Sequence, residues 1–198
     1  RIAAKRPQNP RAHGNLGQAL NQDGRTDEAI VSLRKALQLD PAYVAAHTNL
    51  GRALAASGQY QDAESHYAEA LRLDPGYAPA HNNWGVALVD QDRPAEAQAH
   101  YEAALRLEPE YAQAQNNLGV ALLQRGRLDE ATAQYAEALR MRPDYVETYS
   151  NLGNVLLQFG KPAEAIDCYR RAIASNPDYA EAHNNLGNAL LKRDMPNE

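Results

Sequence analysis

The sequence predicts an all-α fold, in which helix–turn–helix repeats of about 34 residues stack as a right-handed superhelical solenoid. Residues 112–145, with the sequence AQAQNNLGVALLQRGRLDEATAQYAEALRMRPDY, match the chain again at residues 78–111 and at residues 146–179. A fixed period of this size is typical of solenoids, whose repeats bury their apolar faces against one another. Within this repeat Ala114, Leu118, Ala121 and Leu122 follow the i, i+4, i+7, i+8 spacing of one helical face.

The period divides the chain into five complete repeats with a fragment at each end. The complete repeats are residues 10–43, 44–77, 78–111, 112–145 and 146–179. Residues 1–9 are interpreted as the end of a preceding repeat. Residues 180–198 are interpreted as the first helix of a truncated sixth repeat, because residues 194–198 align with the start of a second helix at 92–96. We therefore expect both ends to be cut from a longer array.

Each repeat is expected to run from a first helix through a short turn to a second helix. Glycine, which takes the left-handed conformation without a steric cost, ends a helix at the turn. The turn glycines are Gly24, Gly58, Gly126 and Gly160, with Asp92 and Asp194 at the same place in the other two copies. Pro94 and Pro162 are expected to begin second helices, where a missing N–H costs nothing.

A second glycine series lies inside the first helices, although glycine there costs up to about 1 kcal/mol relative to alanine. Its members are Gly17, Gly51, Gly85, Gly119, Gly153 and Gly187. We expect the second helix to approach each glycine too closely for a Cβ. Around Gly119 the expected neighbour is Ala131.

These recurring residues resemble tetratricopeptide repeats over essentially the whole chain. Leucine or tryptophan precedes each helical glycine, small residues recur in the second helices, and a proline closes each repeat. The alanines are Ala29, Ala63, Ala97, Ala131 and Ala165, and the prolines are Pro41, Pro75, Pro109, Pro143 and Pro177. The resemblance implies that the first helices line a concave surface that binds a protein or peptide.

Composition excludes several functions for the 198-residue chain. Its net charge of −5 argues against nucleic-acid binding, which needs a basic face. No apolar run approaches the length that a membrane-spanning helix needs. Cys168 is the single cysteine, so no intrachain disulfide can form. The abundance of alanine and arginine suggests a bacterial source. The compartment is open, with the cytoplasm favoured, because the chain begins at Arg1 and a leader could have been removed or left out.

Catalytic and metal-binding motifs are absent from the sequence, so we expect a non-enzyme without cofactors. Histidines do recur at one place in successive repeats, at His13, His47, His81 and His183, and a second pair is formed by His66 and His100. Histidines at the same place in neighbouring repeats could share a metal ion. A half-buried packing role is the favoured interpretation, because no carboxylate or cysteine completes a ligand set.

One polar series is unbroken and is expected to face the concave surface. This Asn ladder consists of Asn15, Asn49, Asn83, Asn117, Asn151 and Asn185, and further amides flank it at Asn82, Asn116, Asn154, Asn184 and Asn188. An amide offers both a donor and an acceptor to the backbone of an extended peptide. Packed helices lie about 8–10 Å apart and a strand rises about 3.3 Å per residue, so one asparagine would meet every third peptide residue. Alternatively, the asparagines tie neighbouring helices together.

Two further functions remain open. The ladder is similar to the repeat domain of O-linked N-acetylglucosamine transferases, where the resemblance implies that the asparagines hold substrate peptide. The chain would then be the substrate-recruiting part of a glycosyltransferase. Alternatively, apolar faces left open at the two ends would associate weakly head to tail, which would make the chain a self-assembly module.

Overall fold

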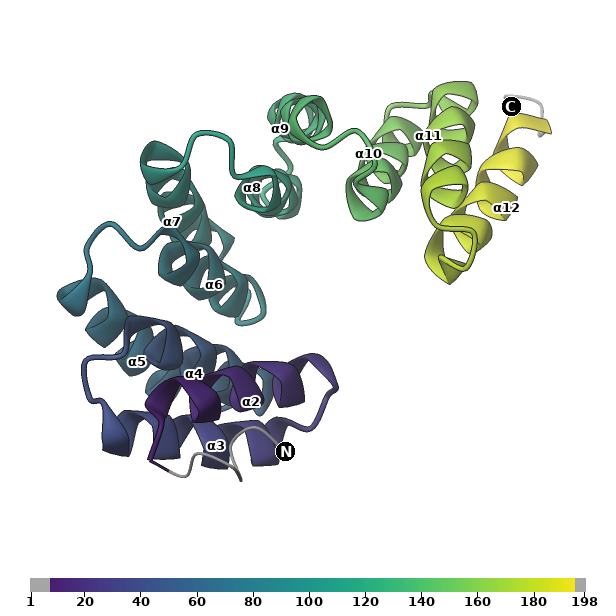
Figure 1. Ribbon diagram of the computed structural model, residues 1–198. Helices are drawn as coiled ribbons and strands as arrows, with labels where there is room; N and C mark the ends of the chain where they lie inside the picture. Colours follow the sequence, from purple (N-terminus) through teal and green to yellow (C-terminus); the bar gives the residue numbers. More distant parts are fainter. Residues whose placement is uncertain (1–7, 195–198) are drawn as a thin grey trace. The chain divides into compact units, whose positions relative to one another are not determined.

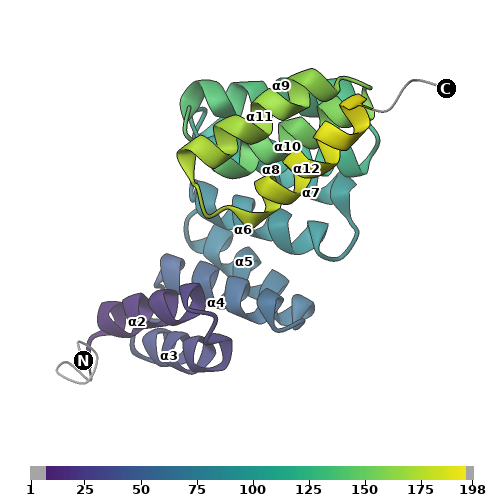
Figure 2. The same ribbon diagram turned by 90° about the vertical axis from the view of Figure 1, so that its right-hand side faces the viewer.

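The structure is a computed structural model that describes residues 8–194, and every regular element in this part of the chain is an α-helix (Figure 1, Figure 2). The first helices of the repeats are α2 (Pro10–Gln22), α4 (Val44–Ala56), α6 (Ala78–Val89), α8 (Ala112–Gln124), α10 (Val146–Gln158) and α12 (Ala180–Asp194). The second helices are α3 (Thr26–Leu39), α5 (Tyr60–Leu73), α7 (Pro94–Leu107), α9 (Leu128–Met141) and α11 (Pro162–Ser175). The predicted all-α class is confirmed. The expectation for residues 1–9 falls mostly outside the described residues.

The helices form two compact units, one up to Glu108 and one from Pro109 onward. In the first unit each first helix packs on its own second helix, α3 packs on α4 and α5 on α6, and α4 also contacts α2 and α6. In the second unit α10 packs on α9 and α11 and also contacts α8 and α12. Consecutive first helices are therefore neighbours within each unit, and this contact positions the Asn ladder.

The turns between first and second helices close in one way in all five complete repeats. The N–H of the residue after the turn position donates to the carbonyl of a leucine near the end of the first helix, as Arg25 N does to Leu20 O at 2.9 Å. Such a bond satisfies a carbonyl at the helix end and needs a left-handed residue just before the donor. Gly24, Gly58, Gly126 and Gly160 have φ between 70° and 78°, and Asp92 has φ 57°. The predicted helix-ending role of this position is confirmed.

The glycines inside the first helices mark close crossings, but the predicted neighbour was wrong. A Cβ on Gly119 would lie 2.5 Å from Cε1 of Tyr135, and Ala131 is not among the nearest atoms. Tyrosines fill the same place at Gly51, Gly85 and Gly153, whereas Leu33 does so at Gly17. The ring of Tyr135 is fully buried in the crossing, so the glycine makes room for an aromatic ring.

Candidate functional site

In the first unit, three ladder residues follow one another on α2, α4 and α6. Asn15 is exposed, whereas Asn49 and Asn83 are half-buried. Among the described residues, the side chains of Asn15 and Asn49 form no hydrogen bond, so both amides remain available to a ligand. Asn83 accepts one bond at Oδ1, from Asn82 Nδ2 at 3.2 Å, and keeps its NH2 group.

Two of the flanking amides are not accessible, which corrects their predicted role as peptide contacts. Asn82 is 0% exposed and Asn116 is 5% exposed. Each donates from Nδ2 to the ladder residue that follows it, Asn116 to Asn117 Oδ1 at 3.3 Å. The residue before the ladder position lies toward the facing first helix, so a peptide cannot reach it. These amides orient the ladder side chains and do not contact a peptide themselves.

In the second unit the ladder residues are also ties between helices. Asn151 Nδ2 on α10 donates to Asn116 Oδ1 on α8 at 3.2 Å, and Thr148 Oγ1 donates to the same oxygen at 3.0 Å. Buried amide atoms must find partners, and these bonds satisfy Asn116. The alternative role of the ladder as a helix tie therefore has direct support in this unit.

The same kind of tie joins α12 to α10. Asn185 Nδ2 donates to Asn154 Oδ1 at 3.1 Å and lies 3.5 Å from Ser150 Oγ. Asn154 Oδ1 also accepts from the hydroxyl of Tyr169 at 2.8 Å. The carbonyl oxygens of Asn151 and Asn185 accept no such bond within the described residues and remain open to a ligand donor. Asn184 and Asn188 are exposed on α12.

Arg52 lies beside the candidate site. It lies one helical turn after Asn49 on α4, so the two side chains share a face. Its Nε and Nη2 atoms are buried without a hydrogen-bond partner in the described structure. Buried donors on a cation are costly when unpaired, and because these two atoms are buried a ligand cannot reach them directly.

The histidines pair within repeats, and not between the same places of neighbouring repeats. His47 Nδ1 lies 3.0 Å from His66 Nδ1, and His81 Nδ1 lies 3.1 Å from His100 Nδ1. Each pair joins a first helix to its own second helix. Burial lowers the pKa of His66, and burial together with the neighbouring His81 lowers the pKa of His100 to about 4. No group of three metal-ligating side chains occurs among the described residues.

At the equivalent place in the fourth repeat, Gln115 Nε2 donates to Gln134 Oε1. In the fifth repeat Tyr149 and Cys168 pack in one apolar cluster. Burial raises the pKa of the Cys168 thiol to about 11, so it is a thiol and a poor nucleophile at neutral pH. In the second, third and fourth repeats, this first-helix side chain therefore lies within hydrogen-bond distance of the residue 19 positions later on its own second helix.

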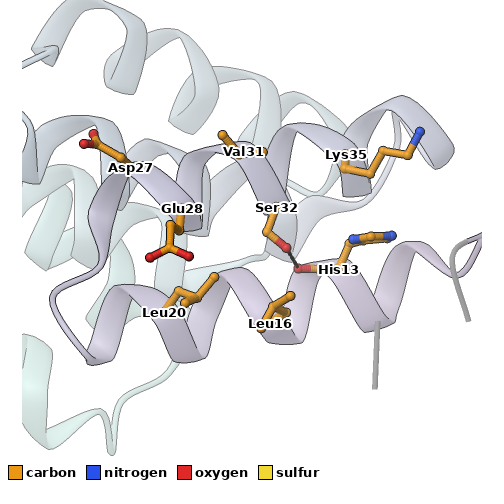
Figure 3. A pocket seen from close by; sticks show the side chains of 8 residues that line it. All are labelled: His13, Leu16, Leu20, Asp27, Glu28, Val31, Ser32 and Lys35. Atoms are coloured by element: carbon orange, nitrogen blue, oxygen red, sulfur yellow. Dashed lines mark hydrogen bonds between the residues drawn. The ribbon is translucent and has the colours of Figure 1, made fainter. Parts of the chain in front are cut away.

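A hollow lies on the open side of α2 and α3 (Figure 3). Leu16 and Leu20 from α2 and Val31 from α3 line its apolar part, and Asp27 and Glu28 lie at one end. Leu16 is 38% exposed and Val31 is 68% exposed. In the next repeat the residue equivalent to Leu16 is Leu50, which is 1% exposed because the preceding helix pair covers it.

Comparisons with known proteins identify the repeat. Residues 2–190 match the family described as the Cilia and flagella-associated protein 70 C-terminal domain, a tetratricopeptide-repeat family. The structure of pilF from Pseudomonas aeruginosa is 25% identical with a TM-score of 0.78, over 96% of this chain and 93% of that chain. TTC0263, a tetratricopeptide-repeat protein of Thermus thermophilus, is 25% identical with a TM-score of 0.82, over 92% of this chain and 99% of that chain.

A further solved structure with the same fold is YrrB, described as a tetratricopeptide-repeat protein with an unusual peptide-binding site. It is 22% identical with a TM-score of 0.62, over 92% of this chain and 94% of that chain. No curated protein matches the sequence. None of the described helices has the length and the apolar composition needed to cross a membrane.

Proposed function

The chain belongs to the tetratricopeptide-repeat family described as the Cilia and flagella-associated protein 70 C-terminal domain, and from that premise we propose that it is a non-catalytic scaffold that binds an extended peptide through the Asn ladder. Repeats of this family are generally protein-interaction modules. The peptide would lie across the first helices, with its backbone N–H and C=O groups paired with asparagine amides.

The unpaired amides of the first unit carry this proposal. The side chains of Asn15 and Asn49 form no hydrogen bond among the described residues, and Asn83 keeps both amide hydrogens. In the second unit Asn151 and Asn185 already donate to the preceding first helix. The first unit therefore offers complete amides to a ligand, whereas the second offers carbonyl oxygens.

A further observation supports a peptide ligand. YrrB, which shares the fold, is described as having a peptide-binding site.

The test compares two double variants. Asn15→Ala with Asn49→Ala removes amides whose side chains form no hydrogen bond among the described residues, whereas Asn151→Ala with Asn185→Ala removes ties. A peptide ligand selected from a displayed random library on the wild-type chain is the probe, and fluorescence anisotropy gives its Kd. A net hydrogen bond is worth about 0.5–1.5 kcal/mol, so the first variant should bind about 5- to 150-fold more weakly with an unchanged melting temperature.

The second variant should lose stability as well as affinity, because it leaves Asn116 and Asn154 with fewer donors. Normal helicity and an unchanged Kd in the first variant would show that the ladder is structural. The proposal also fails if selection on the wild-type chain enriches no peptide.

Self-assembly is a second candidate, and the hollow on α2 and α3 favours it. Its acidic end at Asp27 and Glu28 complements Lys192 on α12, next to Leu191, which is 69% exposed. The occupant would be α12 of a second copy. Sedimentation at rising concentration should show weak association that Val31→Lys abolishes and Val86→Lys, on α6, leaves intact. A wild-type chain that stays monomeric throughout would exclude this candidate.

A further inference from the structure

Two imidazole pairs lie inside the first unit, each between a first helix and its own second helix. In each pair the closest atoms are the two Nδ1 atoms, 3.0 Å apart for His47 and His66 and 3.1 Å apart for His81 and His100. The ring planes meet at 41° and 43°, and the centroids lie 5.2 and 5.3 Å apart. Two repeats thus present the same pair of nitrogen ligands in the same geometry.

The surroundings fix which nitrogen of His47 carries its proton. Nε2 of His47 lies 3.0 Å from the carbonyl oxygen of Pro41, and a carbonyl can only accept, so Nε2 is protonated. A neutral His47 therefore presents a bare lone pair at Nδ1. A backbone carbonyl that holds the far N–H is the usual outer support of a metal-bound histidine, because it fixes both the tautomer and the ring orientation.

We propose that His47 with His66, and His81 with His100, are two bidentate sites for a divalent late transition-metal ion. Imidazole suits copper, nickel and zinc. With metal–nitrogen bonds of about 2.0–2.1 Å, nitrogens 3.0 Å apart subtend an angle of about 95° at the metal. That angle fits two adjacent corners of a tetragonal Cu(II) or Ni(II) site better than a zinc tetrahedron.

The remaining coordination positions would hold water. No third histidine, cysteine or carboxylate joins either pair among the described residues. His66 and His100 are half-buried, so one side of each pair faces solvent from which the ion and its waters can enter. Each ion would cross-link a first helix to its second helix, α4 to α5 and α6 to α7.

Binding requires a change of tautomer but no net loss of protons from a neutral pair. Without metal, His66 Nδ1–H donates to the lone pair of His47 Nδ1. With metal, both Nδ1 atoms coordinate, so the proton of His66 moves to its Nε2. Burial lowers the pKa of His66 and of His100, which opposes the protonation of these two rings.

The chain contains a natural control for the histidine pairs. Gln115 and Gln134 occupy the equivalent place in the fourth repeat and bond to each other, so replacement of both histidines of a pair by glutamine copies a contact the array already uses. The variants are His47→Gln with His66→Gln, His81→Gln with His100→Gln, and all four together. His13 and His183 stay in place and report binding to histidines outside the two pairs.

Calorimetric titration of the whole chain with Cu(II) at pH 7 should give two sites in the wild type, one in each double variant and none in the fourfold variant. Electron paramagnetic resonance should show two equivalent nitrogens per ion. Unchanged stoichiometry in the fourfold variant would overturn the proposal, as would a spectrum with a single nitrogen.

A measurement without variants guards against loss of folding. In the wild type labelled with nitrogen-15, addition of diamagnetic Zn(II) should convert His66 Nδ1 from a protonated to an unprotonated nitrogen signal. A His66 Nδ1 that stays protonated at saturating Zn(II) would also overturn the proposal. Circular dichroism identifies the variants that are folded and can be compared.

Discussion

At the residue scale, the tyrosine that fills the helix crossing in the second to fifth repeats explains the glycine opposite it. Tyr67, Tyr101, Tyr135 and Tyr169 are at most 1% exposed, and a Cβ on the facing glycine would lie 2.5–2.7 Å from a ring carbon. The burial of these rings raises the pKa of their hydroxyl groups. The hydroxyl of Tyr135 is buried without a hydrogen-bond partner in the described structure, so the side chain contributes to the crossing by the volume of its ring and not by a hydrogen bond.

Gly119→Ala should therefore destabilise the protein by about 1–3 kcal/mol, the usual cost of overpacking. Gly187→Ala is the matched control, because it changes the same repeat position in α12 where no atom lies within 4 Å of the added Cβ. There the better helix propensity of alanine should raise stability by up to about 1 kcal/mol. Urea denaturation measures both. Equal effects would show that the crossing does not require glycine.

The second residue-scale prediction concerns the loss of folding stability at acidic pH. The pKa of His100 in the folded chain is about 4, against an ordinary value of 6.5, because burial and the neighbouring His81 oppose its charge. Arg93 also opposes the charge, whereas Glu64 and Glu96 favour it. As the pH falls from 6.5 toward 4, the unfolded chain takes up a proton that the folded chain refuses. This contribution to stability is complete above about pH 6.5 and is lost toward pH 4.

Replacement of His81 and His100 by glutamine should therefore reduce the loss of stability between pH 7 and pH 5. Urea midpoints of the wild type and the variant at both pH values provide the measurement. The carboxylates are common to the two proteins and cancel in the comparison. An identical loss in both proteins would contradict the prediction.

At the scale of the helix, Asp92 is the one non-glycine residue with positive φ among the described residues. It holds the left-handed position at the end of α6, where Arg93 N donates to Leu88 O at 2.9 Å, as in the repeats that have glycine. Asp92→Gly should stabilise the chain by about 1 kcal/mol, since a side chain in this conformation is strained. Gly126→Ala should destabilise it by a similar amount. Thermal unfolding checks both, and an Asp92→Gly variant that is no more stable would contradict the first.

Helix positions followed from the sequence because each boundary has a local cause, such as Pro94 at a start or Gly126 at an end. The side chains that face the helical glycines could not be predicted in the same way. Small size made Ala131 the expected neighbour of Gly119, whereas the side chain that reaches across the crossing is the larger Tyr135. Tyr135 lies one helical turn after Ala131, and its ring extends across the crossing to cover the glycine. The periodicity of the sequence does not show how far a side chain extends.

The candidate site was predicted in part. The ladder positions could be read from the repeat, but the bonds between Asn151, Asn116 and Thr148 depend on how close two first helices lie. The histidine pairs were missed because the period invited comparison of equivalent residues. The contact is made between two different positions, as in His47 with His66, at a separation of 19 residues. A recurrence of like residues at that second spacing, including Gln115 and Gln134, was the available signal.

At the scale of the whole chain, contacts group the helices into two units that divide between Glu108 and Pro109. Arrays of repeats unfold in segments when one segment is weakened. Gly119→Ala lies in the second unit, so it should raise amide hydrogen exchange in α8 and α9 and leave exchange in α4 and α5 unchanged. Mass spectrometry of the exchanged peptides measures the exchange rate separately in the two pairs of helices. Uniform acceleration along the chain would show that the units unfold as one.

The matched contacts between first and second helices also bear on how so repetitive a chain finds its native pairing. The first helices share one glycine and the second helices share their alanines, so a newly formed second helix meets several first helices with the same crossing surface. The side chains at the paired position differ: imidazole meets imidazole in two repeats and amide meets amide in another. A mispaired helix would leave a buried polar atom without its partner, at a cost of about 1–3 kcal/mol. These side chains thereby distinguish the helices of the fourth repeat from those of the second and third, whose histidine pairs are interchangeable, while the glycine–tyrosine crossing is the same in all three.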